Sequence, residues 1–141
     1  MEQLIAHLVG DYVLQTDHMA ERKSKSLLVA FGHAAVYSLP FLFILDVPIL
    51  EFVAFPYFPF PYSPALLTIV VTHALIDHFR LARYVVWAKN QLAPKVYRYP
   101  FEKAAWHGYQ ANKPDWLAGW LYIIADNTIH LLVNYCAIRW L

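Results

Sequence analysis

Three pairs of histidine and aspartate share one spacing in this chain of 141 residues. The pairs are His7 with Asp11, His73 with Asp77, and Asp126 with His130. Their i, i+4 spacing places both side chains on one face of a helix, about 5–6 Å apart at Cβ. Imidazole and carboxylate both bind divalent metals, so one helix could present two ligands to one ion. With His33 as a further imidazole, the spacing predicts one or two divalent ions, Zn first, with Mn, Fe or Mg as alternatives.

The carboxylates of two of these pairs lie in apolar surroundings, so their negative charge needs a partner. Asp77 and Asp126 stand in apolar blocks, where an isolated carboxylate costs at least about 2.5–3.5 kcal/mol. A divalent cation would compensate this cost most completely. Hydrogen bonds or ion pairs that only hold the helices together are the alternative. The repetition of one spacing on three segments favours the metal site.

Residues near the pairs could complete such a site. Asp17 and Gln15 follow the first pair and could add a ligand or an outer hydrogen bond. Arg80 and Arg83 follow the second pair and could bind a phosphate, although anchoring at the membrane surface is the alternative. His78 is expected outside the ligand set, because it points about 100° away from Asp77 on a helix. Two further histidines are expected to face solvent: His18 and His107.

The elements that must position these residues are membrane helices. The chain is 60% hydrophobic and 15% charged, with a mean hydropathy of +0.39, whereas soluble domains are about 45–50% apolar and about 25% charged. Most of the apolar residues fall into three long blocks. A net charge of +1 without a basic run argues against a nucleic-acid partner.

The sequence therefore predicts an all-α integral membrane bundle with three transmembrane helices and an N-terminal amphipathic or re-entrant helix. The chain is expected to be a single complete domain, since Glu2 stands where a secretory signal would be basic. The predicted parts are an amphipathic helix and basic turn (1–26), a first span (27–45), an external Pro and aromatic loop (46–64), a second span (65–87), a basic cytoplasmic loop (88–115) and a third span (116–140). A kink is predicted at Pro40.

Basic residues predict the orientation of the spans. Residues 46–64 contain no Lys or Arg, whereas seven lie between Arg80 and Lys113. Because basic loops stay on the cytoplasmic side, the N-terminus should be cytoplasmic in a multi-pass inner-membrane protein. The single cysteine, Cys136, excludes an intrachain disulfide.

The segment from His7 to Asp17 resembles a known motif, H-x-x-G-D-F/Y-x-x-Q-T/S-D. It is typical of family 3307 of the domains of unknown function, which comprises small bacterial and phage membrane proteins. His33, the H-x-x-x-D of His73 to Asp77, and Asp126 to His130 extend the resemblance, with Asn127 where the family commonly has Gln. The pattern is more distantly similar to inner-membrane metal-dependent hydrolases.

Together, the metal site and the resemblance favour a membrane-embedded metal-dependent hydrolase that acts on a lipid or prenyl phosphoester near the cytoplasmic leaflet. Asp17 or Asp11 would serve as general base, and the His and Asp pairs with His33 would hold the metal. Membrane lipid is the expected partner, and a homo-oligomer is left open. The alternative is a non-enzymatic membrane protein, either a metal or proton carrier or a phage-encoded effector, whose polar residues stabilise the bundle.

Overall fold

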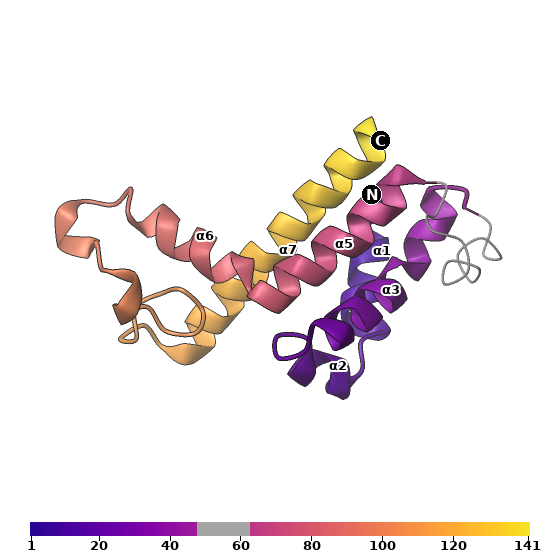
Figure 1. The fold of residues 1–141 in the computed structure, drawn as a ribbon. Helices are drawn as coiled ribbons and strands as arrows, with labels where there is room; N and C mark the ends of the chain where they lie inside the picture. The colour runs from indigo at the N-terminus through magenta and orange to yellow at the C-terminus, as the bar shows by residue number, and fades with distance from the viewer. Residues whose placement is uncertain (48–62) are drawn as a thin grey trace. The chain divides into compact units, whose positions relative to one another are not determined.

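The computed structural model describes residues 1–47 and 63–141 (Figure 1). These residues form helices and one isolated antiparallel bridge between Ala104 and Gln110, and no strand element occurs in the described ranges. The predicted all-α class is therefore confirmed. Most of the predicted external loop of residues 46–64 lies outside the described residues. The described chain divides into two compact units, residues 1–79 with 130–141, and residues 80–129.

The N-terminal segment consists of three short helical pieces. Helix α1 spans Glu2–Leu8, and the π-helix η1 continues it over Val9–Val13. Helix α2 spans Asp17–Arg22 and begins where the Thr16 hydroxyl accepts a hydrogen bond from the backbone N–H of Met19. This capping bond explains the start of α2, because the first backbone N–H groups of a helix lack partners within it.

Two long helices are long and apolar enough to cross a membrane. Helix α3 spans Leu27–Ile44 and starts at Ser26, whose hydroxyl accepts from the backbone N–H of Val29. Helix α7 spans Asp115–Trp140. These bounds agree with the predicted first and third spans within a residue. Pro40, where the sequence predicts a kink, lies inside α3 without ending it.

The helix predicted over residues 65–87 is divided in the structure. Helix α5 spans Pro64–Phe79 and α6 spans Leu81–Asn90, with Arg80 between them in a left-handed conformation at φ 51°. A right-handed helix cannot continue through such a residue, because its backbone angles differ in sign. The two helices amount to a third span only if they are counted together.

In the first unit, small side chains bring α3 and α5 together. Ala30 and Ala34 of α3 and Ala74 of α5 form one buried cluster, and small residues allow helix backbones to approach closely. Tyr37 and Phe41 of α3 belong to a second cluster, which also takes side chains from α1, α5 and the end of α7. The close α3–α5 contact matters for the site, because each helix carries one of its histidines.

The second unit is built around α6 and the first part of α7. It also contains two short 3-10 helices, η2 (Lys95–Tyr97) and η3 (Phe101–Lys103). Its core combines Val86 of α6 with Tyr109 and with Ala118 of α7. The Tyr99 hydroxyl donates a hydrogen bond of 2.8 Å to the carbonyl of Gly108, which fixes the connecting loop.

Candidate metal centre

Four of the predicted ligands meet inside the first unit. Asp11 comes from η1, His33 from α3, and His73 with Asp77 from α5, so three segments contribute. All four side chains are buried, with exposed fractions between 0% for His33 and 8% for Asp11. One ligand atom from each lies within 4.8 Å of the others. Two of the three spaced pairs thus contribute to the group, Asp11 from the first and both His73 and Asp77 from the second, and His33 joins them from α3.

Five of the six separations among the four ligand atoms are short enough for one bound ion. His33 Nε2 lies 3.1 Å from Asp11 Oδ1, 3.0 Å from His73 Nε2 and 3.4 Å from Asp77 Oδ2. His73 Nε2 lies 3.4 Å from Asp11 Oδ1 and 3.1 Å from Asp77 Oδ2. The edge of a tetrahedron is ~1.63 times its centre-to-corner distance, so these five edges correspond to about 1.8–2.1 Å, close to the Zn–N and Zn–O distances of about 2.0–2.2 Å. The sixth separation, between a carboxylate oxygen of Asp11 and one of Asp77, is at most 4.8 Å.

A close backbone contact places Asp11 in this group. A Cβ atom on the neighbouring Gly10 would lie 2.7 Å from the carbonyl oxygen of Tyr37 and 2.5 Å from its ring. Only glycine therefore lets η1 approach α3 so closely. The backbone N–H of Leu14 bonds to the carbonyl of Val9 at 3.0 Å, which is the i to i+5 pattern of a π-helix, a form often found at functional sites.

The second oxygen of each carboxylate faces another histidine. Asp11 Oδ2 lies 3.5 Å from Nδ1 of His7, and Asp77 Oδ1 lies 3.5 Å from Nε2 of His130. His7 and His130, which the sequence predicts as ligands, therefore approach the carboxylates from outside the four-residue group. Burial favours the neutral form of Asp11, but hydrogen bonds from His33 and His73 outweigh it and hold the pKa of this carboxyl well below its usual range.

Tyr37 connects several of these groups. Its ring stacks on His73 with centroids 3.6 Å apart and planes 17° apart. Its hydroxyl lies 2.8 Å from His7 Nδ1 and accepts a hydrogen bond of 2.6 Å from Asn134 Nδ2. The Nδ1 atoms of His33 and His73 have no hydrogen-bond partner among the described residues. Most metal-binding histidines are oriented by a hydrogen bond from the ring nitrogen that does not bind the metal. The His73 ring is oriented instead by stacking on Tyr37.

Sequence reasoning missed Tyr37 and Asn134 because it looked for the i, i+4 spacing only among histidine and aspartate. Both continue the spacing of the pairs, since Tyr37 follows His33, and Asn134 follows His130, by four residues. Extending the i, i+4 search to every polar side chain of the apolar blocks would have found both.

Lys23 also reaches the centre and was predicted only as part of a basic turn. Its Nζ lies 2.9 Å from Asp77 Oδ2 and 3.5 Å from His33 Nε2, and its side chain remains 20% exposed. His78 donates a hydrogen bond from Nδ1 to the carbonyl oxygen of Lys23 at 3.1 Å. His78 is thus outside the ligand set, as predicted, and it holds the turn that carries Lys23.

The other predicted residues are not in the four-residue group. Asp126 lies on α7 one turn before His130, in the second unit. Asp17 is exposed at the start of α2, and Gln15 is half-buried just before it. In the second unit, the Arg80 guanidinium lies 5.3 Å from the ring centre of Trp106, and the Arg83 guanidinium lies 4.8 Å from that of Phe101. Both arginines thus contact aromatic faces, as cations often do.

The two histidines expected to face solvent differ. His18 is exposed, whereas His107 is fully buried, so that prediction is wrong for His107. The backbone N–H of Tyr109 donates to His107 Nδ1 at 3.1 Å, in a turn where Gly108 adopts φ 82°. The turn folds the imidazole inward, and burial lowers the pKa of His107.

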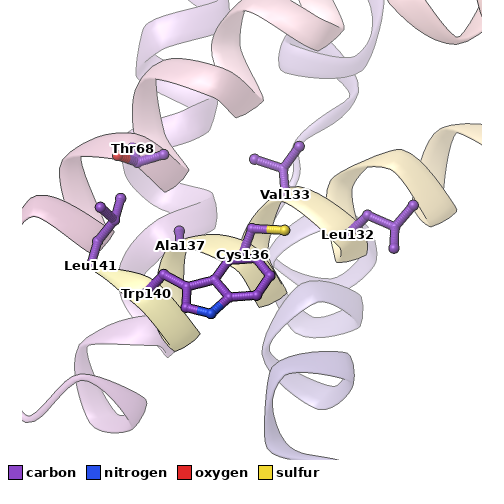
Figure 2. A pocket seen from close by; sticks show the side chains of 7 residues that line it. All are labelled: Thr68, Leu132, Val133, Cys136, Ala137, Trp140 and Leu141. Carbon is purple, nitrogen blue, oxygen red and sulfur yellow. The ribbon is translucent and has the colours of Figure 1, made fainter.

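An apolar pocket of about 380 Å³ lies elsewhere in the first unit (Figure 2). Thr68 of α5 lines it together with residues of the last turns of α7, including Cys136 and Trp140. Thr68 is five residues from His73 along α5, which corresponds to about 7.5 Å of helix. None of the four clustered ligands lines this pocket.

These observations define an all-helical protein with at least two helices able to cross a membrane and a buried His and Asp cluster able to hold a metal ion. Residues 1–134 match the model of a family described as a protein of unknown function, DUF3307, and the chain belongs to this family. The resemblance seen in the motifs is thereby confirmed. No curated protein and no solved structure matches the chain.

Proposed function

We propose that this chain is a membrane-embedded metal-dependent hydrolase that cleaves a lipid or prenyl phosphoester near the cytoplasmic leaflet. The observation that carries the proposal is the convergence of one ligand atom each from Asp11, His33, His73 and Asp77 in a buried position, with five of their six separations between 3.0 and 3.4 Å. A cluster that served only packing would not require four ligand atoms to share one centre.

The residues of the centre have distinct roles in this proposal. Asp11, His33, His73 and Asp77 hold the ion, and His7 and His130 position the two carboxylates from outside. A bound divalent ion would supply an activated water near neutral pH and polarise the phosphoester. Since both oxygens of Asp11 are engaged, Asp17 is the proposed general base. It takes a proton from the attacking water, whose oxygen bonds to phosphorus while the bond from phosphorus to the lipid oxygen breaks. Asp17 then returns this proton to the lipid oxygen, which leaves as the alcohol.

The membrane arrangement in this proposal has three spans, α3, α5 with α6, and α7, with the N-terminus in the cytoplasm. Basic residues support it, because they lie before α3 and between residues 80 and 113.

Metal analysis and an activity assay test the proposal together. Protein purified in detergent without chelators should contain about one or two divalent ions per chain, and it should release phosphate from a panel of lipid phosphates. The variant His33→Gln removes one ligand, so it should lose both the metal and the activity that the wild type shows. A wild-type protein without bound metal would refute the proposal.

A proton or metal carrier is the second candidate, and one observation favours it. The polar side chains form a continuous buried series from His7 and Tyr37 to His73, His33 and Asp77, and such series suit proton relays. Flux of protons or metal across vesicles that contain the protein, without phosphate release from any lipid phosphate, would select this candidate.

A further inference from the structure

Lys23 is the charged group that links the buried cluster to the exterior of the first unit. The four clustered ligands are at most 8% exposed, whereas the Lys23 side chain is 20% exposed. Its ammonium nevertheless approaches Asp77 Oδ2 to 2.9 Å and His33 Nε2 to 3.5 Å. These two atoms are themselves two of the four ligand atoms described above, 3.4 Å apart, so Lys23 contacts one side of the centre.

The turn that carries Lys23 is held at both ends. The backbone N–H of Ser26 bonds to the carbonyl of Arg22 at 2.9 Å, and the Ser26 hydroxyl caps α3, so the turn between the two helices has defined boundaries. The backbone N–H of Lys23 bonds to the carbonyl of Met19 at 2.9 Å, and His78 of α5 donates to the carbonyl of Lys23. Only the side chain of Lys23 is therefore free to change partners, because its backbone is fixed.

The charges of the group imply competition between Lys23 and a metal. Asp77 Oδ2 can serve either as the partner of the ammonium or as the ligand of an ion, since two cations at that oxygen repel each other. The two carboxylates and one ammonium leave one net negative charge, because imidazole must be neutral to bind a metal. A divalent ion turns this into one net positive charge, which an anionic group would neutralise.

We propose that the ammonium of Lys23 competes with the metal for Asp77 and, once an ion has bound there, turns outward to bind the phosphate group of the substrate. This inference rests on the proposed function and assigns its anion-binding residue. Lysine is suited to the role, because it is a compact charge on a flexible stem and a common phosphate ligand. The site would thus take an anionic phosphate in preference to a neutral lipid headgroup.

The test compares Lys23→Met with Lys25→Met. Lys25 lies in the same turn and is exposed, so both variants remove one positive charge at nearly the same place. Zn²⁺ affinity is measured in detergent by competition with a chromophoric chelator, and inorganic phosphate binding is measured on the Zn²⁺-loaded protein. Lys23→Met should bind Zn²⁺ about tenfold more tightly and phosphate about tenfold more weakly than Lys25→Met, at the lower end of outer-shell effects on metal affinity.

Opposite changes in the two affinities are the signature of this role, since a merely structural lysine would not tighten metal binding when it is removed. Lys23→Arg keeps the charge and should bind phosphate as the wild type does. This result would show that Lys23→Met binds phosphate weakly because it lacks the charge, and not because it folds incorrectly. Equal Zn²⁺ affinity or equal phosphate affinity in Lys23→Met and Lys25→Met would overturn the inference.

The outcomes also separate this inference from the proposed function. If every variant binds Zn²⁺ and Lys23→Met matches Lys25→Met, the metal centre stands and the role of Lys23 is refuted. If only Lys23→Met binds Zn²⁺, the competition stands and the metal-dependent hydrolase is refuted. If no form binds Zn²⁺, both are refuted.

Discussion

Adding one methyl group at Gly10 should move Asp11 out of the metal centre. The new Cβ would lie 2.7 Å from the carbonyl oxygen of Tyr37, whereas ordinary contact begins at 3.4 Å. Segment η1 must therefore withdraw from α3 by about 0.7 Å, while metal sites tolerate deviations of only about 0.2 Å. Gly10→Ala should lower Zn²⁺ affinity by about 10–100-fold. It should also lower the free energy of unfolding by about 1–3 kcal/mol, as overpacking does.

Gly32 provides the matched control for this substitution. It lies inside α3, and a Cβ atom added there would meet nothing within 4 Å. Gly32→Ala should leave Zn²⁺ affinity unchanged and should raise stability by up to about 1 kcal/mol, because alanine favours helix more than glycine does. Chelator competition and thermal unfolding in the same detergent measure both quantities. Equal Zn²⁺ affinity in Gly10→Ala and Gly32→Ala would refute the reasoning.

Three further predictions address the ligands, the supporting tyrosine and the topology. Asp77→Asn should lose the bound metal by elemental analysis, whereas Asp17→Asn should keep it and slow phosphate release by about 100-fold or more; metal retained in the first variant would contradict the ligand assignment. Tyr37→Phe should lower the free energy of unfolding by about 1–3 kcal/mol in denaturant titrations, because the buried Asn134 amide loses the acceptor of its hydrogen bond; an unchanged value would contradict that role. Ser63→Cys, in a chain with Cys136 replaced by serine, should react with impermeant maleimide on intact cells, and labelling only after lysis would reverse the orientation.

Periodicity was sufficient to predict the long helices and part of the centre. Apolar blocks of spanning length predicted α3 and α7, because a stretch of about 20 mostly apolar residues is typical of a membrane-spanning helix. The i, i+4 pairs gave Asp11, His73 and Asp77, since a helix fixes which side chains share a face. The α3 histidine, His33, could be added because it is a rare polar residue in an apolar block.

The features that sequence reasoning missed depend on tertiary contacts or on local backbone conformation. Arg80 adopts left-handed backbone angles without being glycine or asparagine, so no local signal marks the break between α5 and α6. The π-helical form of η1 becomes understandable only from the close contact of Gly10 with Tyr37. Lys23 belongs to a basic turn of the kind that anchors many membrane proteins, and only the folded turn directs its ammonium to Asp77.

The burial of the four ligands has a consequence for the timing of metal acquisition. With at most 8% of any ligand residue exposed, an ion can leave or enter only when a segment of the protein opens. The residence time of an ion bound there would then be set by this opening and less by the strength of its bonds. The protein would retain the ion that was abundant while its helices assembled, because that ion would exchange slowly. Two cells with different metal supplies during synthesis would hold the same chain with different ions long after the supplies had become equal.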